Sequence, residues 1–138
     1  MDRPISTFVH GILDYVTAPT LIMLPRMLKL GNMATNILSA AGLSVLGYSV
    51  MTRYELGVFK LIPMKTHLTM DIVSGAALTM APFLFVKGGL DRMPAVRLTF
   101  LGFGLFEIAA GLMTKTQPSP TADESPVTNV KNAVASGA

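Results

Sequence analysis

The sequence predicts an all-α membrane protein, a bundle of four transmembrane helices, from its composition and from the spacing of its charges. Of the 138 residues, 51% are hydrophobic and only 14% are Asp, Glu, Lys or Arg, and the mean hydropathy is +0.53. A soluble domain usually carries about a quarter charged residues. Four intervals hold either no charged residue or a single acidic one, and each is near the roughly 20 residues that a helix needs to cross the bilayer. Such runs leave no polar face for solvent.

The four helices are expected to form one transmembrane domain, residues 1–114. Pro4 suits the first turn of a helix, and Gly88-Gly89 would end the third one. Small residues in the second and fourth helices allow the close backbone packing that lipid favours. The predicted helices cover about residues 5–24, 33–52, 66–86 and 94–114.

Two segments are expected to lie outside the hydrocarbon. The connector, residues 53–65, alternates apolar side chains with Arg53, Lys60 and Lys65, a mixture that predicts a position in the headgroup plane. Residues 115–138 are rich in Pro, Ser, Thr and Ala with scattered charge, and this composition predicts a disordered tail.

The first and third apolar runs carry the same polar motif, His-x-x-x-Asp. His10 and Asp14 open the first run, and His67 and Asp71 open the third run 57 positions later. Other residues coincide at that offset and suggest two tandem helical hairpins, namely Val16/Val73, Leu21/Leu78, Met23/Met80 and Pro25/Pro82.

These motifs predict a polar cluster inside the membrane, near one end of the helices. Residues four apart share a helix face, and the first and third helices run parallel, so both motifs should lie at similar depth. Counting residues back from the ends of the second and fourth helices places Tyr48 and Glu107 at the same depth as the two motifs. A charged side chain at a helix centre costs about 2.5–3.5 kcal/mol on insertion scales, so such a recurrence needs a reason. The predicted cluster contains His10, Asp14, Tyr48, His67, Asp71 and Glu107.

The residue types leave four roles open for this cluster. It could be a structural or scaffolding feature that pins the helices together, or it could hold a proton or cation. Two imidazoles and two carboxylates also make an adequate tetrahedral set for zinc or another divalent metal, with His10, Asp14, His67 and Asp71 as ligands. A b-haem between the two histidines is the fourth option. No nucleophile motif or phosphate loop accompanies the cluster, so no enzymatic activity and no catalytic residue are predicted.

The distribution of basic residues bears on partners and orientation. They stand singly at the ends of apolar runs, as beside membrane helices, so the lipid bilayer and further copies of the chain are the expected partners rather than nucleic acid. Four crossings place six basic residues on the side of the termini and five on the other side, which favours cytoplasmic termini. The two sets are Arg3, Arg53, Lys60, Lys65, Lys115 and Lys131, and Arg26, Lys29, Lys87, Arg92 and Arg97.

Three stretches resemble the SPW-repeat membrane proteins of bacteria, over roughly residues 5–115. They are Ser6-Thr7 with His10-Gly11-x-x-Asp14-Tyr15, then Thr52-Arg53-Tyr54-Glu55-Leu56-Gly57, and Ile62-Pro63-Met64-x-x-His67-Leu68-x-x-Asp71. The resemblance implies a small protein of four helices in two tandem hairpins, in the bacterial cytoplasmic membrane, and it implies no particular activity. The tripeptide that names the family reads Leu24-Pro25-Arg26 and Ala81-Pro82-Phe83 here, and the chain has no tryptophan.

Overall fold

The computed structural model describes residues 2–85 and 93–137, and in these ranges the chain is helical without strands, which confirms the all-α prediction. Four long helices are followed by a short C-terminal one. The helices are α1 (Thr7–Met27), α2 (Asn32–Met51), α3 (Met64–Leu84), α4 (Pro94–Met113) and α5 (Pro126–Ala135).

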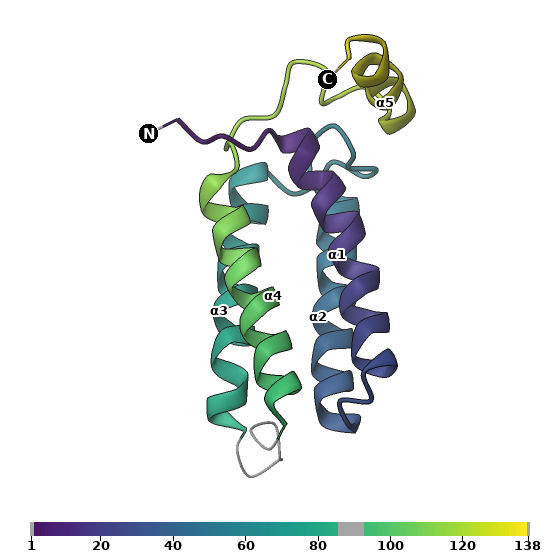
Figure 1. The fold of residues 1–138 in the computed structure, drawn as a ribbon. Coiled ribbons are helices and arrows are strands. Elements are labelled where there is room, and N and C mark those ends of the chain that lie inside the picture. Colours follow the sequence, from purple (N-terminus) through teal and green to yellow (C-terminus); the bar gives the residue numbers. More distant parts are fainter. Residues whose placement is uncertain (1, 86–92, 138) are drawn as a thin grey trace.

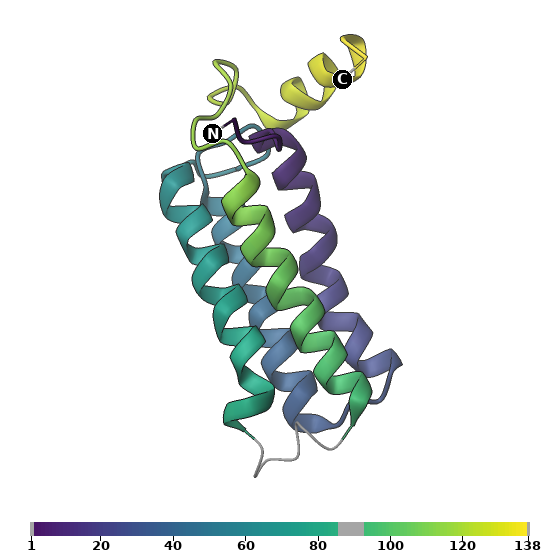
Figure 2. The ribbon, with the colours of Figure 1, turned by 60° about the vertical axis from the view of Figure 1, so that its left-hand side comes forward.

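The four long helices lie side by side, with both termini and the α2–α3 connector at one end (Figure 1). Helix α1 packs along α2, and α3 packs along α4, whereas α2 and α3 make few contacts (Figure 2). Apolar side chains fill the space between the four helices. The most buried of them are Ala18, Leu21, Leu38, Val45, Val96 and Phe100.

Three of the helices, α1, α2 and α4, are long and apolar enough to cross a bilayer, which supports the prediction of a membrane protein. Large apolar side chains on their outer faces are exposed, including Val16, Leu43 and Leu98. This outward apolar surface is what a helix in contact with lipid needs. Helix α3 is less apolar because Lys65, His67 and Asp71 all lie in its first two turns.

The observed helix ends differ from the predicted ones at positions set by a capping serine and by prolines. Helix α1 begins after Ser6, whose Oγ accepts a hydrogen bond from Val9 N, and it continues through Pro25 to Met27, three residues beyond the predicted end. Helix α3 begins at Met64, directly after the extended Pro63. The predicted end of this helix at residue 86 and the break at Gly88-Gly89 lie outside the described residues.

Residues 126–135 form helix α5 in a segment for which composition predicts a disordered tail. Ser125 caps α5 by accepting a hydrogen bond from Thr128 N, and Pro126 occupies its first turn. The helix is anchored through the buried Asn129, whose Nδ2 donates to the backbone oxygen of Glu55 over 3.0 Å. Composition shows that this segment has few apolar residues. It does not show a single contact such as the hydrogen bond from Asn129 to Glu55.

Candidate metal centre

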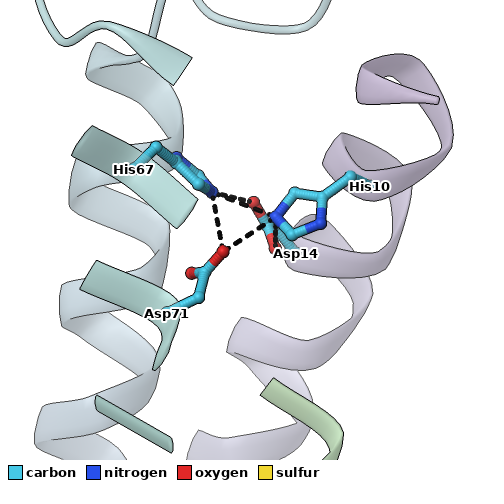
Figure 3. A group of neighbouring side chains, drawn as sticks. All are labelled: His10, Asp14, His67 and Asp71. Carbon is cyan, nitrogen blue, oxygen red and sulfur yellow. Dashed lines mark hydrogen bonds and ion pairs between the residues drawn. The ribbon is translucent and has the colours of Figure 1, made fainter. Parts of the chain in front are cut away.

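Two helices bring four ionisable side chains together near the end that carries the termini. His10 and Asp14 come from the first two turns of α1, and His67 and Asp71 come from the same position in α3 (Figure 3). Within each helix the two residues share a face because they are four apart. All four are buried, with exposed fractions of 1%, 7%, 0% and 3%.

The side chains meet through one nitrogen of each imidazole. His10 Nε2 lies 3.2 Å from His67 Nε2 and 2.9 Å from Asp71 Oδ2. His67 Nε2 lies 3.0 Å from Asp14 Oδ2 and 3.4 Å from Asp71 Oδ2, and His10 Nε2 lies 3.4 Å from Asp14 Oδ1. Each histidine therefore contacts both aspartates, so the two halves of the chain share one centre.

The other ring nitrogen of each histidine is fixed by a threonine at the C-terminal end of a neighbouring helix. Thr114 Oγ1 donates to Ala110 O over 2.7 Å, so its oxygen accepts from His10 Nδ1 at 2.8 Å. Thr52 Oγ1 likewise donates to Tyr48 O over 2.6 Å and accepts from His67 Nδ1 at 2.8 Å.

These two hydrogen bonds determine which way the imidazoles present their lone pairs. Since each Nδ1 is the donor, a neutral ring has its lone pair on Nε2, which faces the centre. A metal-binding histidine usually has this arrangement, in which the outer N–H is donated to an acceptor and fixes both tautomer and ring orientation.

The carboxylates are oriented by hydroxyl groups of α2. Tyr48 Oη donates to Asp71 Oδ1 over 2.6 Å, and Ser49 Oγ donates to Asp14 Oδ2 over 2.8 Å. In contrast, Asp71 Oδ2 points at the imidazoles without a hydrogen bond of acceptable geometry. One carboxylate oxygen and two nitrogen lone pairs thus face each other in a space closed to water.

Such a centre is electron-rich and needs a positive occupant. Four ligand atoms, one from each residue, lie within 4.8 Å of one another. A tetrahedral zinc with bonds of about 2.0–2.1 Å places its ligand atoms about 3.3 Å apart. The five nitrogen–nitrogen and nitrogen–oxygen separations, from 2.9 to 3.4 Å, fall around that value. Two of these separations use different oxygens of Asp14, and the four-atom set spans up to 4.8 Å, so a tetrahedral divalent metal would draw its ligand atoms closer together.

The same distances do not fit a haem held by both histidines. The Nε2 atoms would then lie on opposite faces of a porphyrin, each bonded to iron. Here they are 3.2 Å apart, and both carboxylates lie beside them where the ring plane would pass.

Aromatic side chains cover the imidazoles on the side of the connector. The rings of Tyr48 and Tyr54 lie 4.8 Å and 5.9 Å from the His67 ring, centre to centre. Tyr54 has no exposed surface, and it fits because residue 11 of α1 is glycine: a Cβ there would collide with the Tyr54 ring. Tyr54 therefore packs the connector against α1 and the His67 ring.

The structure joins five of the six residues predicted for the cluster through direct polar contacts. Tyr48 joins the four ionisable residues through Asp71. Glu107 is buried in α4, but neither of its carboxylate oxygens has a hydrogen-bond partner among the described residues.

Sequence reasoning missed three residues of the centre, Ser49, Thr52 and Thr114. Each lies near the C-terminal end of α2 or α4, where the antiparallel neighbours of α1 and α3 reach the depth of the histidines. Thr52 and Thr114 directly follow the last residue of their helices, and that shared position is the signal that could have found them.

A further buried acid, Glu55, lies in the connector between α2 and α3. Both of its carboxylate oxygens accept from Thr7 Oγ1, over 2.9 and 2.7 Å, and Oε1 also accepts from Ser119 N over 3.1 Å. Burial alone would raise the pKa of Glu55, but these hydrogen bonds outweigh it and hold the pKa below its ordinary value of 4.5.

Comparisons of the chain with protein-family models, with curated proteins and with solved structures find no match. The resemblance to SPW-repeat proteins therefore remains a prediction, and the functional argument depends on the geometry of the site.

Proposed function

We propose that the protein is a multi-pass membrane protein that binds one divalent transition-metal ion, with zinc as the best fit, through His10, Asp14, His67 and Asp71. The observation that carries this proposal is the convergence of two Nε2 lone pairs and two carboxylates at tetrahedral spacing in a buried centre. Without a metal ion or protons on the Nε2 atoms, these groups would repel one another. A divalent ion would balance the two aspartates and leave the centre neutral.

The choice of metal follows from the ligand types and the size of the centre. Imidazole and carboxylate together suit zinc and its neighbours in the first transition row. Magnesium demands octahedral oxygen coordination and calcium takes six to eight oxygen ligands, which this four-ligand centre does not offer. With no cysteine in the chain, a site for softer ions that require thiolate is not supported.

We further infer that α1–α4 form a four-helix bundle of two tandem hairpins that crosses the bacterial cytoplasmic membrane four times. Helix α3 is included because it packs closely along α4, where Gly75 and Gly104 face each other. Both termini and the connector lie at the end that collects six of the eleven basic residues, which supports cytoplasmic termini (Figure 1). A fluorescent protein fused after residue 138, which fluoresces only in the cytoplasm, tests this orientation.

Metal analysis and calorimetry test the main proposal. Protein purified in mild detergent without chelator should contain close to one zinc per chain by elemental analysis. After the metal is stripped, titration should restore one zinc per chain and raise the thermal unfolding temperature. His67→Ala should abolish both responses.

Two results would contradict the proposal. A stripped protein that takes up no zinc, nickel, cobalt or manganese and keeps the same unfolding temperature would show that protons on the imidazoles hold the cluster together. Equal zinc binding by the wild type and His67→Ala would place the metal elsewhere.

A further inference from the structure

A polar pocket lies where the start of α1 meets the end of α4. Arg3 and Lys115 line it together with Asp2, and its volume is about 520 Å³. Two backbone hydrogen bonds hold its walls together. Ile5 N donates to Met113 O over 3.1 Å, and Lys115 N donates to Ile5 O over 2.9 Å. The pocket is therefore a fixed feature of the fold, built from the segments that precede α1 and follow α4.

The lining of this pocket has a net positive charge. Its two cations, Arg3 and Lys115, outnumber Asp2, and neither forms an ion pair within residues 2–85 and 93–137. In these ranges the guanidinium of Arg3 donates one hydrogen bond, to the backbone oxygen of Thr114 over 3.0 Å. An arginine has five N–H donors and a lysine has three, so most of these donors are available to an anionic ligand.

The pocket lies at the aqueous ends of two membrane helices. Both α1 and α4 are long and apolar enough to cross a bilayer, and the pocket adjoins the end of each that faces the termini (Figure 1). Lipid phosphates occupy this level of a bilayer, and basic pockets between membrane helices bind anionic headgroups.

An apolar groove lies deeper between the same two helices. It extends along α4 from Phe106 to Leu98, is bordered by Val16 of α1, and has a volume of about 400 Å³. Gly102 of α4 keeps it wide, because a Cβ at this position would meet no other part of the protein within 4 Å. The groove therefore has room for an apolar chain.

Exposed apolar side chains connect the pocket with the groove. Val9 and Ile12 precede Val16 at spacings of seven and four on the same face of α1, and Met113 follows Phe106 by seven on α4. Phe106 lies nine residues before Lys115, about 13 Å along the helix at 1.5 Å per residue. That distance is within one leaflet, which is half of a hydrocarbon core of about 30 Å. A free phosphate would use the pocket alone, whereas a phospholipid would use both pocket and groove.

We propose that the pocket and the groove between α1 and α4 together bind one anionic phospholipid. Its phosphate lies at Arg3 and Lys115, and one acyl chain lies in the groove over Gly102. The cations select a charged headgroup over a zwitterionic one, and the groove adds apolar contact that a free anion lacks. The inference does not depend on the metal centre, so the two proposals are tested separately.

Native mass spectrometry of the full chain in mild detergent tests the selectivity of the pocket. Phosphatidylglycerol, which is anionic, is compared with zwitterionic phosphatidylcholine that has the same acyl chains. The wild type should retain one phosphatidylglycerol with at least about fivefold higher affinity. Lys115→Gln should weaken phosphatidylglycerol binding about fivefold, since it removes one basic residue. Lys131→Gln, which removes the same charge from α5, is the control and should match the wild type.

A second pair of variants tests the groove. Gly102→Phe places a ring where the acyl chain is expected, so it should lower the affinity for phosphatidylglycerol severalfold. Gly47→Phe on α2 is the matched control, because a Cβ there also meets no other part of the protein within 4 Å. It lies outside the groove and should leave the affinity unchanged.

Photolabelling in liposomes covers the case in which a variant fails to fold. A phosphatidylglycerol with a diazirine in one acyl chain should label the wild type within residues 98–106 of α4. Unlabelled phosphatidylglycerol should suppress this labelling more strongly than phosphatidylcholine does. Labelling spread evenly over the outer faces of the four long helices would overturn the proposal.

Three further results would contradict it. Equal affinity for the two lipids would show that the basic residues do not select a headgroup. Inorganic phosphate that binds as tightly as the lipid would make the pocket a site for a free anion. A dimer of the chain that Gly102→Phe dissociates would place a second copy of the protein in the groove.

Discussion

The proposed metal centre and Glu55 are two buried acidic sites at the same end of the molecule, and the carboxylates of the two sites have different partners. Glu55 accepts hydrogen bonds only from neutral donors, the hydroxyl of Thr7 and the backbone of Ser119. Asp71 has one oxygen bonded to Tyr48, while the other faces the Nε2 atoms of two imidazoles whose Nδ1–H groups donate to Thr114 and Thr52.

The difference separates a structural acid from a ligand. Glu55 ties together the start of α1, the connector and the C-terminal segment, and its two oxygens have donors that belong to the fold. At the proposed metal centre the fold supplies a threonine acceptor to Nδ1 of each ring and a hydroxyl donor to one oxygen of each carboxylate. The inner atoms are left for a cation.

The largest effect is expected from Asp71→Asn. This change removes one anionic ligand and leaves an amide facing the imidazoles, so the dissociation constant for zinc should rise more than about 100-fold. Calorimetry of the stripped protein measures it, with Asp123→Asn as the matched control. An unchanged affinity would remove Asp71 from the coordination set.

The next effect is expected from the threonines that fix the histidine rings. Thr52→Val and Thr114→Val keep the side-chain shape but remove the acceptor for Nδ1. Loss of such an outer partner typically lowers metal affinity about 10- to 100-fold. Thr99→Val, in which the lost hydroxyl bonds only to Ala95 O, is the control and should change nothing. Equal affinities in all three variants would show that these hydrogen bonds do not orient the ligands.

A change at Glu55 should affect stability rather than metal binding. Glu55→Gln places an amide where Thr7 and Ser119 donate, and it should lower the free energy of unfolding by about 1–3 kcal/mol. Because the folded-state pKa of Glu55 lies below 4.5, its contribution is complete above pH 4.5 and is lost as the pH falls through the folded-state pKa. The difference in thermal unfolding between the two proteins should therefore shrink as the pH falls below 4.5. A difference that grows as the pH falls, or a weaker zinc affinity, would contradict this role.

The smallest effect is expected at the anchor of α5. Asn129→Ala removes the hydrogen bond to Glu55 O and should cost about 1 kcal/mol, mostly as local undocking. Hydrogen exchange in residues 126–135 should accelerate, while exchange in α1–α4 stays the same. Asn132→Ala, on the exposed face of the same helix, is the control. Slow exchange in the Asn129 variant would show that other contacts hold α5.

The sequence predicts the cluster well because it depends on two simple rules. Residues four apart share a helix face, and the first and third helices of consecutive hairpins run parallel. Spacing of four residues and a parallel course for α1 and α3 are enough to bring His10 and His67 together. The same counting brings Glu107 near this depth, but it does not give the direction of the side chain, which reverses in an antiparallel helix. Counting along the helices does not predict Thr52 and Thr114, because they contact the histidines from the ends of other helices. Helix α5 is not predicted because its buried residue is an asparagine, Asn129, and not an apolar face.

X-ray absorption at the zinc edge of the zinc-loaded protein tests the central claim most directly. The account predicts four nitrogen and oxygen neighbours at about 2.0–2.1 Å, with the outer-shell scattering of two imidazoles. A six-oxygen shell without imidazole scattering, or zinc that washes away during desalting, would contradict it.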